Sequence, residues 1–188
     1  SIFHQRLIYD ELLAHQFFFR GKYHENKSYK SKPILYSDNI QQEFLSNLEF
    51  KLTNQQESAF SEIKNDISQN YPMYRLLQGD VGSGKTVVAA MGAIQAINSD
   101  FQVAFLAPTE ILAEQHFEKL TFWLAKLGIK VELLTGSMNS KLKAKSYEII
   151  KNGKAKLIVG THALIQEKVE FKFIGLYIID EQHRFGVK

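Results

Sequence analysis

The feature that most constrains the fold is a change of hydrophobic pattern at about residue 74. From there to residue 179, short apolar runs alternate with longer stretches of helical periodicity. The predicted strands are 74–78, 102–107, 130–134, 156–160 and 175–179, and the predicted helices are 85–98, 110–127 and 140–152. Such alternation favours a mostly parallel sheet with helices on both faces. We therefore predict an α/β fold, in which the apolar runs 157–159 and 176–179 are buried on both sides.

The residues before this region follow a different pattern. Apolar residues recur at helical spacing over 2–20, and the polar, basic stretch 21–33 is typical of a loop. A helix is predicted over 38–49 and another from Thr53 to about residue 69. Thr53 suits the N-cap of that helix, because Gln56 follows three positions later as in a capping box. We predict a helical extension over 1–49 and the α/β domain over 50–188.

Composition excludes several classes of protein. A length of 188 residues suits one domain with a helical appendage, and the absence of cysteine excludes a disulfide scaffold or a thiolate nucleophile. No apolar run approaches the ~20 residues of a membrane span. The net charge of +3 belongs to residues 1–32, because the remaining 17 basic and 17 acidic residues cancel. Net charge is therefore a weak argument for nucleic-acid binding.

Small, hydroxyl-bearing or charged residues follow every predicted strand. In open parallel sheets, ligands bind beyond the carboxyl ends of the strands, which all meet at one edge. The segments at that edge are 79–86, 108–110, 135–137, 161–162 and 180–183. Their convergence predicts one composite site.

The first of these segments has the pattern G-x-x-x-x-G-K-T of a phosphate-binding loop. Its glycines let the backbone curl so that its N–H groups face phosphates, while the lysine adds a positive charge and the threonine hydroxyl suits Mg²⁺. The predicted strand before it and helix after it are the required context. The nucleotide-binding residues are predicted to be Gly79, Asp80, Val81, Gly82, Ser83, Gly84, Lys85 and Thr86.

Two acidic residues end the last predicted strand. Asp180 is placed to hold Mg²⁺ together with Thr86, and Glu181 to orient or deprotonate a water molecule, so that Lys85 and Glu181 are the predicted catalytic pair. Two acids alone also occur in exposed turns, but their combination with the phosphate-binding loop favours the functional interpretation. We find no larger acidic cluster of the kind that a two-metal nuclease needs.

The histidines and lysines leave alternatives open. His183, three residues after Asp180, is either a surface histidine or a coupling residue, and the other five histidines show no metal-ligand spacing. The basic stretch 141–156 is either a solvated helix face or a contact for the phosphate backbone of nucleic acid. Trp123 is predicted to pack in the core with Phe117, Leu120 and Leu127.

Taken in order, these motifs resemble those of the first motor lobe of superfamily 2 helicases. LTNQQ at 52–56 resembles the adenine-reading Q-type motif, in which Gln56 would contact the base, and DEQH at 180–183 resembles motif II. APTE at 107–110, TGS at 135–137 and GTHAL at 160–164 resemble motifs Ia, Ib and Ic. The resemblance implies a RecA-like lobe that binds ATP and Mg²⁺. It assigns coupling to Gln182 and His183, and DNA-backbone contacts to Thr109, Glu110, Gly136, Ser137, Thr161 and His162.

Longer sequence segments, such as RLLQGDVGSGKT and IIDEQHRFGV, resemble those of the RecG family within that superfamily. This resemblance is specific over about 50–188 and looser over 1–49. It implies an ATP-dependent helicase of the bacterial cytoplasm, associated with the nucleoid, that remodels branched double-stranded DNA at replication forks and Holliday junctions in repair and recombination. The alternatives are a transcription-repair coupling translocase and a nucleotide-gated switch without motor activity.

The two ends of the sequence bear on the activity that we expect from this chain alone. It starts at Ser1 and stops at Lys188, shortly after the two acids, which is typical of a segment of a longer protein. The junction-splitting wedge domain and the second motor lobe of the family are not in this sequence. Because the second lobe supplies an arginine finger, worth about 10³–10⁵ in rate, the chain alone is expected to bind nucleotide weakly and hydrolyse it slowly or not at all.

Overall fold

The computed structural model describes residues 28–181. The predicted helix over 2–20, as well as Gln182 and His183, lies outside the described residues. The order of elements is α2 (Asp38–Ser46), α3 (Asn54–Ile67), α4 (Lys85–Asn98), β1 (Gln102–Leu106), α5 (Glu110–Leu124), η1 (Ala125–Leu127), β2 (Val131–Leu134), α6 (Ser140–Lys151), β3 (Leu157–Gly160), η2 (His162–Ile165) and β4 (Ile174–Ile179). Except for the segment 74–78, each predicted helix and strand within these residues is confirmed to within three residues at its ends.

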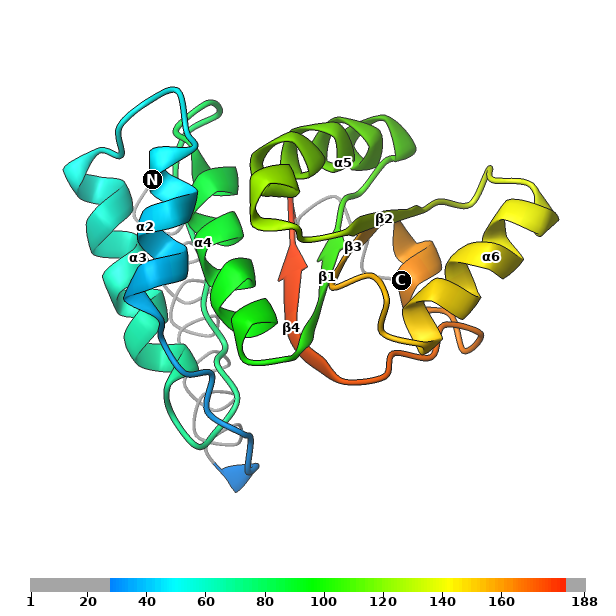
Figure 1. Ribbon diagram of the computed structural model, residues 1–188, viewed down its shortest axis with the longest axis horizontal. Helices are drawn as coiled ribbons and strands as arrows, with labels where there is room; N and C mark the ends of the chain where they lie inside the picture. The colour runs from blue at the N-terminus through cyan, green and yellow to red at the C-terminus, as the bar shows by residue number, and fades with distance from the viewer. Residues whose placement is uncertain (1–27, 182–188) are drawn as a thin grey trace, which may run out of the picture.

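The centre of the molecule is a four-stranded parallel sheet with the order β2-β3-β1-β4. A helix lies between each strand and the next along the chain, as parallel strands require. The register pairs Leu106 with Gly160 and with Ile179, so the carboxyl ends of β1, β3 and β4 lie side by side. The predicted α/β fold class, a parallel sheet flanked by helices, is confirmed (Figure 1).

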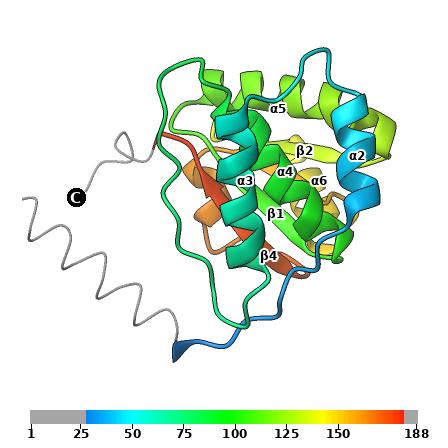
Figure 2. The ribbon, with the colours of Figure 1, turned by 90° about the vertical axis from the view of Figure 1, so that its left-hand side faces the viewer.

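Helices cover both faces of the sheet. α4 and α5 pack on one face, and α2 and α3 form an outer layer against α4 (Figure 2). α6 and η2 pack on the other face through Ile150 and Leu164. The described part of the chain contains no helix that is both long and apolar enough to span a membrane.

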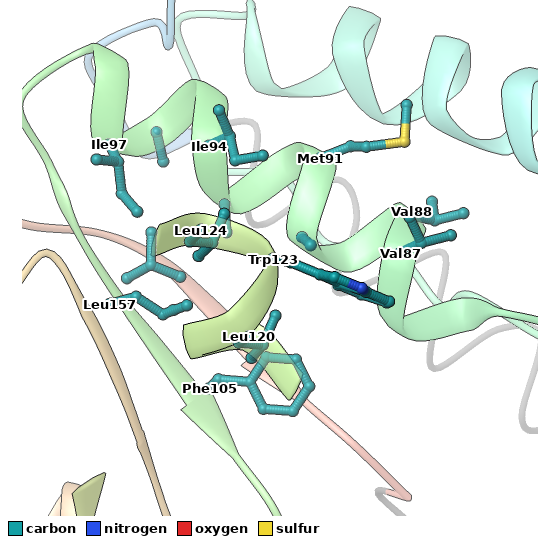
Figure 3. Close-up of a cluster of buried hydrophobic side chains, with 14 of the residues drawn as sticks. Val87, Val88, Met91, Ile94, Ile97, Phe105, Leu120, Trp123, Leu124 and Leu157 are labelled. Carbon is teal, nitrogen blue, oxygen red and sulfur yellow. The ribbon is translucent and has the colours of Figure 1, made fainter. Parts of the chain in front are cut away.

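The larger core joins α4, α5 and the inner face of the sheet. Figure 3 shows this cluster, in which the side chains of Trp123 and Leu120 from α5 lie between α4 and β1. The prediction that Trp123 is a core residue is confirmed, since the side chain is 8% exposed. Its indole packs edge-on against Phe44 of α2, with ring centroids 6.3 Å apart. The boundary at residue 49 remains a prediction, but α2 already shares this core.

The predicted capping box of α3 is present. The Thr53 hydroxyl accepts a hydrogen bond from Gln56 N at 3.3 Å, and Gln56 Oε1 accepts one from Thr53 N at 2.9 Å. Two of the backbone donors that a helix start leaves unpaired are thereby satisfied. The same geometry fixes the position of the Gln56 side chain, which matters for the phosphate-binding loop.

The prediction of a strand over 74–78 is wrong. Residues 72–80 join no ladder, and Leu76 is 60% exposed. A strand needs a neighbour, and β4 pairs only with β1 among the described residues, so no ladder reaches this segment. Instead the segment is held to α3 by side chains, since Arg75 bonds Asp66 at 2.6 Å and Glu62 at 2.5 Å.

The prediction that the run 176–179 is buried on both sides is also wrong. Residues along β4 alternate between half-buried and exposed, and Tyr177 and Ile179 are about half exposed (51% and 49%). Leu176 and Ile178 face the core with α4. Within residues 28–181 the other face of β4 is not covered by a helix, because α6 and η2 pack over β1, β2 and β3.

Candidate functional site

The phosphate-binding loop leads directly into α4. Residues 79–83 form a turn, in which Ser83 N donates to Asp80 O at 3.1 Å. Gly82 and Gly84 have φ angles of 81° and 82°, in the left-handed region that glycine adopts without strain. Gly84 is the N-cap of α4 and offers no side chain to satisfy the first N–H groups. A helix start built in this way is suited to an anion such as phosphate.

Gln56 forms part of the wall of this loop. Its Nε2 donates to Ser83 O at 2.9 Å while its Oε1 is held by Thr53 N. The φ angle of Gly84 favours glycine there, and a Cβ would also displace the end of the Gln56 side chain from its bond to Ser83 O. The structure thus brings Gln56 to the predicted nucleotide site, although its contact with adenine stays a prediction.

Lys85 lies folded over the loop that precedes it. Its Nζ donates to Gly79 O at 2.6 Å and to Asp80 O at 2.8 Å. These are exposed bonds to neutral carbonyl groups, which a phosphate oxygen can replace, since charge-assisted hydrogen bonds are the stronger kind. Lys85 also acts electrostatically on Asp180, so the loop and the end of β4 are neighbours.

Asp180 is fixed at the end of β4 by its backbone and by its side chain. Its N–H donates to Leu106 O of β1 at 2.9 Å. Its Oδ2 lies 2.7 Å from Nε2 of His116, which belongs to α5. The His116 imidazole is the largest cause that holds the pKa of Asp180 below its ordinary value, against the partial burial that raises it. The carboxylate is therefore ionised near neutral pH.

Glu181 adopts an uncommon backbone conformation. Its φ is 48°, in the left-handed region that only a few per cent of non-glycine residues occupy. Its N–H bonds the Asp180 carboxylate. A non-glycine residue in this region costs about 1–2 kcal/mol, and such strain is concentrated at functional sites. This observation supports a functional role for the predicted acidic pair.

The oxygen donors at this edge fit a magnesium ion that retains several waters. Mg²⁺ in nucleotide sites takes one or two carboxylates together with phosphate oxygens. Asp180 supplies one ionised carboxylate and Thr86, in the first turn of α4, one hydroxyl. Among residues 28–181 no group of three metal-ligating side chains gathers, so this donor set alone does not form an all-protein metal cage.

The predicted DNA-contact residues fall into an exposed group and a buried group. Thr109, Gly136, Ser137 and His162 are exposed at the carboxyl edge of the sheet. Thr161 is 2% exposed, and its hydroxyl has no hydrogen-bond partner among the described residues. Thr161 therefore lies beneath the surface that the other residues form.

Glu110 ties two of these segments together. Its Oε1 accepts a hydrogen bond from Ser137 N at 2.7 Å, and the Ser137 hydroxyl and backbone lower the pKa of the Glu110 carboxyl. Lys143 Nζ donates to Gly136 O from the other side. A carboxylate repels phosphate, so this geometry supports a role in which Glu110 holds the 135–137 loop. Its direct contact with DNA remains a prediction.

The basic stretch 141–156 does not form one surface. α6 begins at the carboxyl edge of the sheet and ends at the opposite edge, so Lys141 and Lys145 are separated from the lysines at its far end. At that far end Lys151 pairs with Glu170 at 2.7 Å, and Lys156 lies 3.5 Å from Asp100. Only the first half of the stretch lies beside the candidate site.

Sequence reasoning missed His116. Its position shows no metal-ligand spacing, yet it contacts Asp180, 64 residues away. A signal was available in the sequence. Ala113, His116 and Leu120 recur at the spacing of one helix face, and the first and last of these are fully buried. A polar ring in a buried apolar stripe indicates a polar partner.

Comparisons with known proteins agree with this geometry. A family model described as DEAD/DEAH box helicase matches residues 53–188. The chain is 48% identical to the ATP-dependent DNA helicase RecG of Aquifex aeolicus, over all of this chain and 24% of that protein. It is 45% identical to RecG of Escherichia coli K12, over 97% of this chain and 26% of that protein. The chain thus spans about a quarter of these relatives.

Solved structures give the same result. A structure of RecG bound to a three-way DNA junction superposes with a TM-score of 0.84 at 44% identity, covering 98% of this chain and 25% of that chain. A hypothetical ATP-dependent RNA helicase from Sulfolobus tokodaii shares the fold, with a TM-score of 0.60 at 18% identity over 78% of this chain and 42% of that chain. The predicted resemblance to RecG and the predicted RecA-like helicase fold are confirmed.

Proposed function

The chain belongs to the DEAD/DEAH box helicase family, and we propose that it is the ATP-binding part of a motor that moves on branched double-stranded DNA. The observation that carries the proposal is the convergence of the phosphate-binding loop, Asp180 and Glu181 at one sheet edge. The RecG relatives are named ATP-dependent DNA helicases, and one related structure holds a three-way DNA junction. The full protein would act on forks and Holliday junctions and associate with the nucleoid.

The residues of the loop would bind the phosphates of ATP. Lys85 would exchange its bonds to Gly79 and Asp80 for bonds to phosphate oxygens, while the N–H groups at the start of α4 face the same anion. Gln56, held beside the loop, is positioned to contact the base. Thr86 and Asp180 would hold Mg²⁺, which when bound neutralises phosphate charge and polarises the bond to be broken.

Glu181 would act on the attacking water. Its carboxylate accepts a proton as the water oxygen forms a bond to the γ-phosphorus and the bond from that phosphorus to the bridging oxygen of ADP breaks. Its backbone lies in the left-handed region, directly after the end of β4. The role is consistent with its place beside Asp180.

The exposed residues at the same edge would contact the DNA backbone. Thr109, Gly136, Ser137 and His162 present hydroxyl, backbone and imidazole groups, which suit phosphate contacts that carry no sequence information. A motor that works on any sequence needs contacts of this kind. No observation favours the transcription-repair translocase or the nucleotide-gated switch over the branched-DNA motor.

Nucleotide binding by the full-length protein tests the first step. We expect Lys85→Ala to weaken binding of a fluorescent ATP analogue at least tenfold, because it removes the charge at the phosphates. Lys126→Ala is the matched control, since Lys126 is exposed in η1 and outside the phosphate-binding loop. If Lys85→Ala binds as tightly as the wild type, the assignment of the loop is wrong.

A further inference from the structure

His116 makes a contact that the proposed mechanism does not use. Its Nε2 lies 2.7 Å from Asp180 Oδ2, and the two side chains are 12% and 26% exposed. Its ring also packs against Phe105 of β1, with ring centroids 4.6 Å apart and the planes inclined by 46°. The imidazole is thus enclosed between α5, β1 and the end of β4.

The surroundings of His116 limit its movement. Ala113 and Leu120, one turn to either side on the same face of α5, have no exposed surface. The helix is fixed at its start by the Thr109 side chain, which accepts from Leu112 N at 3.3 Å, and by the bond from Ser137 N to Glu110. A donor held by a packed helix imposes its position on a flexible partner, so the carboxylate orientation follows from α5.

The orientation of the Asp180 carboxylate affects how well it can bind a metal ion. A metal-binding carboxylate presents its free lone pairs in a direction set by the hydrogen bonds it already makes, and loss of such an outer partner typically costs 10–100-fold in metal affinity or activity. Asp180 accepts from His116 and from the N–H of Glu181. Both bonds therefore help to determine which lone pairs face the phosphate-binding loop.

We propose that His116 is a positioning residue of the nucleotide site, which aims the Asp180 carboxylate at the Mg²⁺ of the bound nucleotide. The inference rests on the proposed function, because it needs Asp180 to be a metal ligand. His116 itself touches neither nucleotide nor metal in this account. Its donor nitrogen, rather than the volume of its ring, is the essential group.

Two substitutions separate the donor from the ring. His116→Gln keeps an N–H donor that can reach Asp180 and loses the aromatic packing on Phe105. His116→Phe keeps an aromatic ring against Phe105 and loses the donor. A role in packing alone favours the Phe variant, whereas a role in positioning favours the Gln variant.

The test measures the Mg²⁺ dependence of nucleotide binding by the full-length protein. A fluorescent ATP analogue is titrated at a series of Mg²⁺ concentrations, and DNA-stimulated ATP hydrolysis is measured in parallel. We expect the Mg²⁺ concentration for half-maximal binding to stay within about twofold in His116→Gln. In His116→Phe we expect it to rise about tenfold or more, while binding without Mg²⁺ is unchanged.

A double-mutant cycle covers the case in which one variant folds poorly. If His116 acts through Asp180, then His116→Phe has no further effect on the Mg²⁺ dependence in an Asp180→Asn background. An equal effect in both backgrounds overturns the proposal, as does a Phe variant that matches the wild type. If the wild-type protein itself binds no ATP analogue, the proposed function fails, and that result is distinct from a failure of the His116 assignment.

Discussion

Single residues at the carboxyl edge of the sheet have tightly specified environments. Gln56 belongs at once to the cap of α3 and to the wall of the phosphate-binding loop. Asp180 is held by β1, α5 and its own neighbour Glu181. Small changes at these positions should therefore alter nucleotide binding more than they alter the fold.

Gly84 can be compared with Gly128. Both have positive φ, at 82° and 66°, but a Cβ at Gly84 collides with Gln56 whereas a Cβ at Gly128 meets nothing within 4 Å. We expect Gly128→Ala to destabilise the protein by about 1–2 kcal/mol from backbone strain alone. Gly84→Ala carries the same backbone strain and should in addition displace the Gln56 side chain from its bond to Ser83 O.

Thermal unfolding and binding of an ATP analogue measure both effects in the full-length protein. The expected pattern is that Gly128→Ala binds nucleotide as the wild type does, while Gly84→Ala binds at least tenfold more weakly. Equal nucleotide affinities for the two variants would contradict the close packing of Gln56 on the loop.

The bond between Glu110 and the 135–137 loop should make the stability of that loop depend on pH. Hydrogen bonds from the Ser137 hydroxyl and backbone lower the pKa of Glu110 in the folded state below the ordinary value of about 4.5 for a glutamate. A carboxyl with a depressed folded pKa contributes stability above its unfolded pKa and loses that contribution as the pH falls through the folded value. The tie between Glu110 and the 135–137 loop should therefore weaken below about pH 4.5.

The comparison of wild type with Glu110→Gln isolates this contribution. Hydrogen exchange of the 135–137 amides is measured at neutral and acid pH. We expect slow exchange at neutral pH in the wild type, faster exchange in Glu110→Gln, and convergence of the two as the pH falls, after correction for intrinsic exchange rates. A difference that stays constant with pH would mean that the Glu110 charge does not hold the loop.

At this scale the sequence locates the candidate residues but does not predict their contacts. The phosphate-binding loop and the two acids were identified because their residue types follow predicted strand ends. His116 was not, since its partner is 64 residues away and only the packing of α5 on the sheet brings the two together. Glu110 was predicted as a DNA contact, whereas its observed bond is to Ser137.

The candidate site lies where the strands of the sheet end and the helices that follow them begin. α4, α5 and α6 begin at the carboxyl edge of the sheet, where the strands end, and each is capped or shaped there by a residue of the site or its neighbours. For α5 the cap is Thr109 and for α6 it is Asn139. The helices therefore bring their first turns, and the positive ends of their dipoles, to the surface proposed to face phosphates.

α6 divides the basic stretch and so allows a matched comparison. Lys141 and Lys145 lie in its first half, beside the candidate site, whereas Lys151 and Lys154 lie at the opposite edge. We expect the double change Lys141→Ala and Lys145→Ala to weaken binding of a three-way DNA junction and to lower the magnitude of its salt slope by about two. The changes Lys151→Ala and Lys154→Ala should leave both unchanged.

Filter binding or fluorescence anisotropy over a range of salt concentrations measures these slopes in the full-length protein. The variant with Lys151→Ala and Lys154→Ala has the same net charge as the variant with Lys141→Ala and Lys145→Ala, so it controls for the loss of two positive charges. If both pairs reduce affinity equally, the effect is one of overall charge rather than of a surface at the carboxyl edge.

The sequence predicts helices and strands well where the local residue pattern determines them. It predicts them poorly where their pairing or burial depends on a neighbouring element. The helix starting at Thr53 follows from its capping box, and the strands β1 and β3 follow from their apolar runs. The segment 74–78 has the composition of a strand, but pairing depends on a neighbouring strand that its own sequence does not contain. The exposure of β4 likewise depends on where α6 and η2 pack.

In the molecule as a whole, three layers hold one edge of the sheet in a fixed arrangement. α2 and α3 pack on α4, α4 and α5 pack on the sheet, and α6 with η2 closes the opposite face. The phosphate-binding loop and the end of β4 thus come from different layers and meet at the same edge. The α/β class was predictable from alternation alone, because only a parallel sheet accommodates it, whereas the layer formed by α2 and α3 was not.

We propose that in the full-length protein this edge hydrolyses ATP in response to branched DNA. The most direct measurement is single-turnover ATP hydrolysis by the full-length protein, with and without a three-way DNA junction, for the wild type and Glu181→Gln. We expect the junction to accelerate hydrolysis by the wild type. Glu181→Gln should bind ATP with wild-type affinity and hydrolyse it at least a hundredfold more slowly. Hydrolysis by Glu181→Gln at the wild-type rate would show that Glu181 does not act on the attacking water, and a wild-type rate that the junction leaves unchanged would show that this edge does not respond to branched DNA.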